Sequence, residues 1–320
     1  MRTPSALSDR RRHYDVTNTV CVAEPDAVCA AVCELLQAQD RQADLSPVRR
    51  AFEGFVQLYA GTLPGYAGCD TPYHDAQHSL DCALAFARLY CGHELAEPER
   101  QLGMERGMLG IAIALFHDAG YVRRDTDAAR NGAEYTLSHV ARSAEYLRQH
   151  LADFGLGAHA DLAAELVHFT GYEKPLDSIP VHAPRDRMLG FLVASADLLA
   201  QTSDACYLEK CRDFLYPEFR ICGLAGPRRA GGPEPIYHSV EELLETTPRF
   251  HARVWDERLE GYFQGCHRYL SVFFGGANPY LEAIQAHQAH IRELARTGDY
   301  STLRRRPRAI DREALLRLAG

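Results

Sequence analysis

The sequence predicts an all-α protein. Apolar residues recur at spacings of three and four along most of the chain, and helix-entry signals precede several of these segments. No stretch alternates apolar and polar residues as a half-buried strand would. The chain has 320 residues, of which 46% are hydrophobic and 24% charged, enough for one large or two small domains with a substantial core. We therefore expect a helical bundle.

The N-terminal segment, residues 1–69, is predicted to contain two amphipathic helices. Residues 25–39 and 45–60 each place apolar side chains on one face. A loop rich in Gly and Pro follows, and Thr71 and Pro72 then resemble a helix start, with Thr as the cap and Pro in the first turn. The next helix is therefore expected to begin near Pro72.

The rest of the chain is predicted to be helical as well. The stretch 223–238 contains Gly-Pro, Gly-Gly and Pro-Glu-Pro, so it is interpreted as a loop. This loop separates a metal-binding core, 70–222, from a C-terminal helical segment, 239–320, that packs on the core. Further helices are predicted at about 98–116, 131–152, 160–170, 184–203, 205–217, 239–246, 248–273 and 279–296.

Composition and charge narrow the classes of partner. A net charge of −8 argues against broad binding to nucleic acid or acidic membranes. No apolar segment follows Met1 and no apolar run could span a bilayer, so we expect a cytoplasmic protein. The ten cysteines form no Cys-x-x-Cys pair and are predicted to be mostly buried thiols. The basic cluster 304–308 is interpreted as a solvated or docking segment. The oligomeric state stays open, a homodimer included.

A scattered set of histidines and aspartates indicates metal chemistry. His117 and Asp118 directly follow an almost wholly apolar run, and Asp197 is the one charged side chain between residues 189 and 201. A buried carboxylate needs a cation, a proton or several donors to offset its desolvation. A divalent metal would satisfy it. Asp118 has two oxygens and is the candidate to bridge two metals.

Three further side chains are expected on the helix that follows Pro72. His74, His78 and Asp81 stand at i, i+4 and i+7, so they would share one face of that helix and point into one pocket. Asp81 is a candidate to orient the imidazole of His78 through its second nitrogen. The alternative for Asp81 is a polar residue on an exposed face.

His139 and His168 are the candidates for a second metal. Each lies in a predicted helix between the His-Asp doublet and Asp197, as expected if successive helices line one pocket. The alternative for each is an ordinary core or surface histidine.

The order of these residues along the chain resembles that of a known protein family. The order His78, His117-Asp118, Asp197 on a helical background resembles the HD superfamily of metal-dependent phosphohydrolases, over about residues 70–205. Within that superfamily, the run from Tyr73 to His78 resembles the opening signature of class I cyclic nucleotide phosphodiesterases. The resemblance implies four metal ligands (His78, His117, Asp118 and Asp197), one or two divalent ions (Fe, Mn, Zn or Mg) and a bundle of the phosphodiesterase type.

The same resemblance implies an activity. His74 would be the general acid for the leaving oxygen, and a metal-activated hydroxide positioned with the help of Asp118 would hydrolyse a cyclic nucleotide or a related small phosphoester. The candidate substrate contacts are Tyr73, Lys174 and Gln264, with Arg123 and Arg124 as further candidates for the phosphate. Two departures stand out, because Tyr121 replaces the usual third histidine and Gln264 matches the purine-clamping glutamine only by approximate location.

Two alternatives to a phosphohydrolase remain. If His139 and His168 complete a second metal site, they resemble the additional ligands of HD proteins that hold two metals. Such proteins include two-iron oxygenases. A regulatory protein that keeps the metal but has no turnover is the third option.

Overall fold

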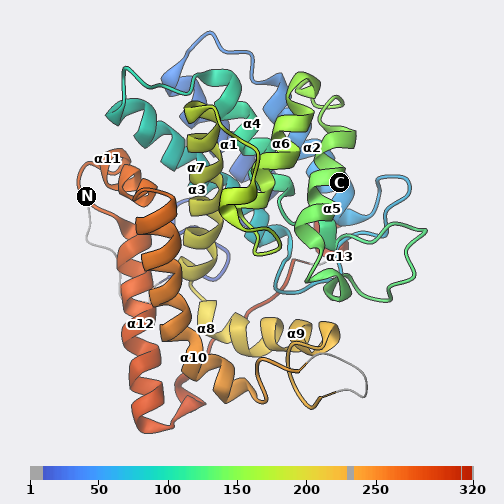
Figure 1. Cartoon of the computed structure of the whole chain (residues 1–320), viewed down its shortest axis with the longest axis vertical. Helices are drawn as coiled ribbons and strands as arrows, with labels where there is room; N and C mark the ends of the chain where they lie inside the picture. Colours follow the sequence, from blue (N-terminus) through green and yellow to red (C-terminus); the bar gives the residue numbers. More distant parts are fainter. Residues whose placement is uncertain (1–9, 229–233, 311, 319–320) are drawn as a thin grey trace.

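The computed structural model describes residues 10–228, 234–310 and 312–318. Over these ranges the chain folds into helices joined by turns and loops, and only isolated β-bridges occur in place of strands (Figure 1). The prediction of an all-α fold is confirmed.

The two N-terminal helices form where the sequence predicts them. Helix α1 spans Pro25–Gln39 and α2 spans Ser46–Ala60, and both carry Pro in the first turn, where its missing N–H costs no hydrogen bond. Gly61 ends α2 in the left-handed conformation (φ 68°), which glycine adopts without strain. Both helices turn their apolar faces to the main core.

Three helices form the centre of the molecule. Helices α3 (Ala76–Ala96), α4 (Met104–Phe116) and α7 (Pro184–Ser203) pack against one another and are buried along most of their lengths. The approach of α3 to α4 is close because Gly110 has no side chain, and a Cβ there would lie 1.9 Å from the Phe86 ring. His78 lies on α3 and Asp197 on α7, and the pair His117-Asp118 directly follows α4.

The predicted start of the third helix is wrong. Asp75, not Thr71, caps α3, since its carboxylate accepts a 3.1 Å hydrogen bond from the backbone N–H of His78. The Thr71 hydroxyl donates to the carbonyl of His74, 3.0 Å away, which holds residues 71–74 in a turn before the helix. His74 therefore lies outside the helix, and the shared helical face inferred for His74, His78 and Asp81 holds only for the last two.

The segment predicted as one helix at 131–152 is divided. A 3₁₀ turn, Gly132–Tyr135, precedes α5, His139–His150. The next helix, α6 (Ala160–Leu166), continues into a 3₁₀ turn at Val167–Phe169.

The C-terminal half contains irregular helices that the sequence pattern does not resolve. Helix α8 (Tyr207–Lys210), a π-helical turn (Cys211–Leu215) and α9 (Tyr216–Cys222) replace the single helix predicted at 205–217. The break predicted between helices 239–246 and 248–273 is absent, since Pro248 lies inside α10 (Val240–Arg253), which continues as a π-helix to Tyr262.

The remaining helices complete the C-terminal half. The predicted helix at 248–273 ends early because Gln264 and Gly265 adopt positive φ angles of 56° and 71°. Helix α11 (Tyr269–Phe273) follows, then α12 (Pro279–Thr297) and a short α13 (Arg312–Leu318). The middle of the loop predicted at 223–238, residues 229–233, lies outside the described residues.

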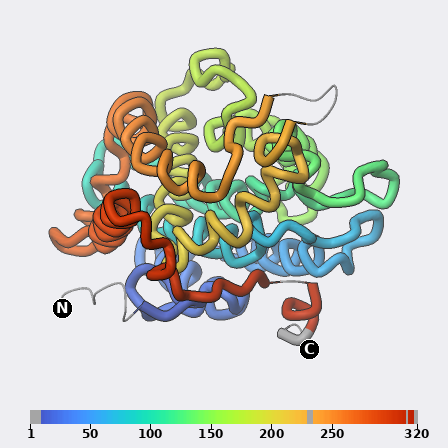
Figure 2. The backbone as a smooth tube through the Cα atoms, turned by 90° about the horizontal axis from the view of Figure 1, so that it is seen from below, coloured from blue at the N-terminus to red at the C-terminus, as the bar shows by residue number. Residues whose placement is uncertain are grey.

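The first described residues, 10–12, lie beside the segment 304–306 that follows α12, and Figure 2 shows the red segment after α12 passing along the lower side of the molecule near the blue N-terminal part. Arg305 donates from Nη1 to the carbonyls of Arg10 and Ala205, at 3.1 and 3.0 Å. The backbone N–H of Ile310 donates to Asp75, 2.7 Å away, on the carboxylate that also caps α3. The basic cluster is thus a docking segment, one of the two options that its sequence allowed.

The cysteines are free thiols, and seven of the ten are buried, as predicted. Among the helices that the structure describes, none combines the length and apolar character needed to cross a bilayer.

Candidate metal centre

Two imidazoles and a carboxylate converge in the core where α3, α4 and α7 meet. Nε2 of His78 lies 3.2 Å from Nε2 of His117 and 3.2 Å from Oδ1 of Asp197. The third distance, His117 Nε2 to Asp197 Oδ1, is 3.6 Å. All three side chains are buried, and this trio could hold a metal ion. Two donors that ligate one ion at about 2.0–2.1 Å are themselves roughly 3 Å apart.

Asp118 lies beside this trio. Its Oδ2 is 3.2 Å from His117 Nε2 and 3.5 Å from His78 Nε2, although it is buried and has no hydrogen-bond partner among the described residues. An unsatisfied buried carboxylate oxygen is costly unless a cation or donor compensates it. A divalent ion at the trio would supply that compensation, so the donors present fit a metal.

The tautomer of His117 also suits a metal. Its Nδ1 lies 2.8 Å from the carbonyl of Ala114, and only a protonated Nδ1 can donate there. The lone pair of the neutral ring is therefore on Nε2, facing the carboxylates. Without a cation, burial disfavours the charged ring, but Asp118 and Asp197 outweigh burial and raise the pKa of His117 to about 9.

His139 faces the other oxygen of Asp118. Its Nδ1 donates to the carbonyl of Thr136 at 2.8 Å, and its Nε2 lies 3.6 Å from Asp118 Oδ1. Burial lowers the pKa of His139, which favours the neutral ring. Asp118 thus has Oδ2 toward the trio and Oδ1 toward His139, the arrangement that a bridging carboxylate requires.

Gly120 sets the position of His139. A Cβ at Gly120 would lie 1.9 Å from the carbonyl oxygen of His139, so the chain after Asp118 approaches α5 more closely than any side chain would allow. The N–H of Gly120 donates to Ser143 and its carbonyl accepts from Arg142, each at 2.8 Å.

His74 stands next to the centre and is held by a buried acid. Its Nδ1 lies 2.7 Å from Oε2 of Glu218, and Oε1 of the same carboxylate accepts from the N–H of Tyr73 at 2.6 Å. Glu218 comes from α9 and is fully buried. Burial alone would lower the pKa of His74, but Glu218 outweighs burial and raises it. The protonated ring is therefore favoured, with Nδ1 engaged and Nε2 turned inward.

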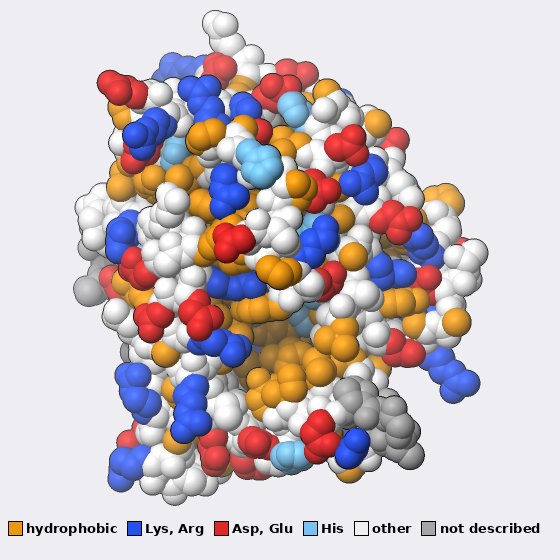
Figure 3. All heavy atoms as spheres, viewed as in Figure 1, with side chains coloured by type: hydrophobic (Ala, Val, Ile, Leu, Met, Phe, Trp, Pro, Cys, Tyr) orange, Lys and Arg blue, Asp and Glu red, His pale blue; other side chains and the backbone are white. Residues whose placement is uncertain are grey.

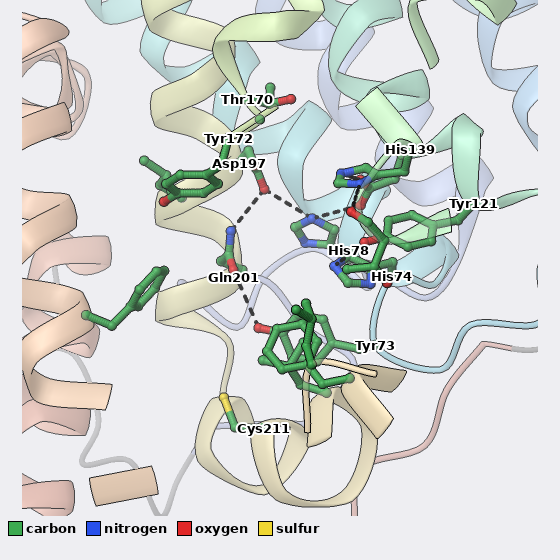
Figure 4. A pocket seen from close by; sticks show the side chains of 18 of the residues that line it. Tyr73, His74, His78, Tyr121, His139, Thr170, Tyr172, Asp197, Gln201 and Cys211 are labelled. Atoms are coloured by element: carbon green, nitrogen blue, oxygen red, sulfur yellow. Dashed lines mark hydrogen bonds and ion pairs between the residues drawn. The ribbon is translucent and has the colours of Figure 1, made fainter. Parts of the chain in front are cut away.

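Tyr121 lies between two of these histidines (Figure 4). Its ring stacks on His74 at 4.2 Å and on His139 at 4.4 Å between centroids. Its hydroxyl is 3.4 Å from Nε2 of His74. The tyrosine that departs from the phosphodiesterase pattern therefore fills the space between His74 and His139 and fixes their planes.

A glutamine orients the carboxylate of α7. Nε2 of Gln201 donates to Oδ1 of Asp197 at 3.1 Å, and the Tyr73 hydroxyl donates to Oε1 of Gln201 at 3.5 Å (Figure 4). Tyr73, a predicted substrate contact, thus lies on the wall of the same pocket.

Asp81 is buried close to His78, one turn along α3, on the wall of a small polar cavity. No hydrogen bond joins it to His78 in the part of the chain that is described, and its Oδ1 has no partner. Burial, reinforced by Asp15 and Asp204, raises the pKa of Asp81 to about 7. The predicted role in orienting His78 is therefore not visible in the hydrogen bonds.

Several predicted site residues lie elsewhere. His168 is buried but does not line the pocket, and its charged neighbours include Lys174 and Glu165. Lys174 itself lies 3.9 Å from Glu165, also off the pocket wall. Gln264 follows the end of the π-helix and lines a different hollow.

The two arginines proposed as phosphate contacts form ion pairs with other side chains. Arg123 lies 3.0 Å from Asp70, and Arg124 lies 3.0 Å from Glu145. Neither lines the pocket that contains the metal centre.

Glu218 and Gln201 are site residues absent from the sequence-based predictions, and Tyr121 had no predicted role. Glu218 is 144 positions from His74, and its neighbours Pro217 and Phe219 resemble those of any surface helix. Gln201 stands four residues after Asp197, so helical spacing alone would have placed it beside that carboxylate.

Comparison with protein-family models gives no match, and comparison with curated proteins gives no significant match.

Proposed function

We propose that this protein is a metal-dependent phosphohydrolase of the HD type that acts on a small phosphoester. The observation that carries the proposal is the combination of two adjacent groups in one pocket. One is the buried trio of His78, His117 and Asp197, and the other is His74 with its buried partner Glu218. A site that binds a cation next to a protonated imidazole suits a reaction that needs both an electrophile and an acid.

Four side chains would hold the first ion: His78, His117, Asp118 and Asp197. A divalent ion bound there lowers the pKa of a water ligand and offsets the charge that builds on the phosphoryl oxygens. Gln201 keeps Oδ1 of Asp197 in place, and the bond from His117 to Ala114 keeps its Nε2 available.

His74 is proposed as the proton donor. Its Nδ1–H donates to Glu218, so the proton available for transfer is the one on Nε2, on the pocket side. That proton would pass to the departing oxygen of the ester. Tyr121, stacked on the ring, restricts the imidazole to this orientation.

A second ion is proposed between Asp118 Oδ1 and His139 Nε2, which are 3.6 Å apart. The position of His168, away from the pocket wall, leaves this second site with few protein ligands. An unequal pair of sites favours hydrolysis over the two-iron oxygenase, which would need a second ion held as firmly as the first.

The test measures metal content and hydrolysis together. The protein, loaded with Mn²⁺, is assayed for ring opening of cyclic nucleotides to nucleoside monophosphates and for release of the alcohol from simple phosphodiesters. We expect His74→Ala to keep the metal and to lose roughly 10²- to 10⁴-fold in kcat. His168→Ala is the control, because it removes a buried histidine off the pocket wall, and it should keep both properties. If the wild type hydrolysed none of the phosphoesters tested, the proposal would be wrong. If the iron-loaded protein consumed oxygen instead, the two-iron oxygenase would be the better assignment.

A further inference from the structure

The metal centre lies at one end of a chamber of about 400 Å³. The proposed reaction assigns no role to the rest of this chamber. The far walls come from the irregular helices after α7, from one side of α10 along its length and from the loop before it. These walls are strongly apolar, and Figure 3 shows a hollow lined with hydrophobic side chains on this face of the molecule. The apolar side chains of the wall include Leu198, Leu215, Phe219, Leu224, Leu243 and Phe250.

Most of the hydroxyl and amide side chains on these walls are already engaged within the protein, whereas Arg253 and Glu173 are charged groups at the edge of the chamber. The hydroxyls of Thr136, Thr170 and Thr247 donate their only protons to backbone carbonyls, at 2.7, 2.8 and 2.9 Å. Such a hydroxyl can still accept a hydrogen bond but cannot donate one to a bound molecule. The wall threonines therefore present mainly their methyl groups and an acceptor oxygen.

The amide and phenol groups are engaged in the same way. Gln201 uses its NH₂ group on Asp197 and its oxygen on Tyr73. The hydroxyl of Tyr207 lies 2.9 Å from Nε2 of His251. A nucleobase is selected by an amide or similar group that pairs with its edge, and the described wall leaves no carboxamide for that purpose.

The mouth of the chamber is apolar as well. Leu137, Tyr172 and Ile236 line the chamber and are exposed to 63%, 59% and 59%. Tyr172 is held in place, because the Arg258 guanidinium stacks on its ring at 3.6 Å and donates to the carbonyl of Gly171 at 2.6 Å. A fixed apolar side chain in solvent gains free energy when an apolar group covers it.

We propose that the substrate of this site is a phosphoester with an extended apolar body, an alkyl or aryl group, and not a nucleotide. This inference rests on the proposed function for the position of the phosphoryl group, which lies at the metal centre. The apolar body fills the chamber and leaves past the exposed side chains of the mouth. Arg253, an exposed cation on the rim, suits the overall negative charge of such a molecule.

The test uses binding, so that it does not depend on turnover. The Mn²⁺-loaded protein is titrated by calorimetry with n-alkylphosphonates from methyl to octyl, and with adenosine monophosphate. Each CH₂ group that enters the chamber is expected to raise affinity about fourfold until the chamber is full. Equal affinity for methyl- and octylphosphonate, or tighter binding of adenosine monophosphate than of octylphosphonate, would overturn the proposal.

Two variants and a control locate the effect. Phe250→Ser in the chamber should lower the affinity for octylphosphonate roughly tenfold and leave the affinity for methylphosphonate unchanged. Ile236→Ser tests the mouth, and its control is Leu95→Ser, since Leu95 is equally exposed at 59% but lies off the chamber wall. Identical losses in Ile236→Ser and Leu95→Ser would contradict a role for the mouth. Chain-length dependence without hydrolysis of any ester would support the apolar chamber and refute the proposed hydrolase.

Discussion

Nδ1 of His74 and Oε2 of Glu218 lie 2.7 Å apart although 144 positions separate the two residues in sequence. One comes from the turn before α3 and the other from α9, so the pair forms only when the C-terminal half folds onto the core. Glu218 also accepts from the N–H of Tyr73, which fixes the backbone on the N-terminal side of the imidazole.

Replacing Glu218 should shift the pH dependence of hydrolysis. Because Glu218 raises the pKa of His74 against the effect of burial, Glu218→Gln should lower that pKa and move the alkaline limb of the kcat profile to lower pH. The substitution keeps the size of the side chain and leaves the metal ligands intact, so metal content should not change. An unshifted alkaline limb would show that His74 is not the acid that the profile reports.

Metal binding should depend on the trio and not on His168. His78→Ala and Asp197→Ala each remove a donor from the buried cluster, and elemental analysis should find the tightly held ion lost. His168→Ala should retain it, since the ring does not line the pocket. If His168→Ala lost the ion while His78→Ala and Asp197→Ala retained it, the assignment of the ligands would be wrong.

The contact between Asp15 and Arg88 should govern acid stability. The two buried side chains meet at 2.7 Å, and Arg88 also donates to the Tyr280 hydroxyl at 2.8 Å. Asp15→Asn should lower the free energy of unfolding by about 3 to 5 kcal/mol, because it leaves the Arg88 charge buried and unpaired. Urea denaturation measures this. Asp161→Asn is the control, since that carboxylate is 91% exposed and its ion pair should contribute under about 1 kcal/mol.

The pH dependence of this contribution has a definite sign. Burial raises the pKa of Asp15, but Arg88 and several hydrogen bonds outweigh burial and lower it to about 2, below the ordinary value of 3.8. The contribution is therefore fully present above pH 3.8 and is lost as pH falls through about 2. The difference in unfolding free energy between wild type and Asp15→Asn should shrink over that window. A constant difference would contradict the pairing.

Gly120 should not tolerate a side chain. Gly120→Ala places a Cβ against the carbonyl of His139, and the backbone there has to shift. We expect a loss of about 1 to 3 kcal/mol in unfolding free energy, as for other overpacked sites. The second, more weakly held ion should be lost before the first, because His139 moves and the trio does not. A variant with wild-type stability would mean that α5 can move away without cost.

Regular, amphipathic helices were the predictable part of this fold. The observed bounds of α7, Pro184–Ser203, match the predicted 184–203, because Pro184 marks the start and the run 189–200 is apolar apart from Ser195 and Asp197. The start of α3 was not predictable in the same way, since both Thr71 and Asp75 are good caps, and only the hydrogen bond from the His78 N–H selects Asp75. The π-helical turns have no recognised pattern of apolar residues and were missed.

The candidate site follows the same division. Within the trio, His117 and Asp197 were predictable because ionisable side chains inside or directly after apolar runs are conspicuous in the sequence. Glu218 was not, because its role depends on a contact between distant segments. His168 has the same apolar neighbours as a ligand would, yet the turn at Val167–Phe169 places it off the pocket wall.

The hydrogen bond from Ile310 to Asp75 means that the site can be completed only after the C-terminal segment has been synthesised. Asp75 caps the helix that carries His78, and the cap receives one of its donors from a segment 235 positions later. A nascent chain that has not yet reached Ile310 has the metal-binding residues but lacks that donor on the cap. A segment synthesised 235 positions after Asp75 therefore completes the anchoring of the helix that carries His78.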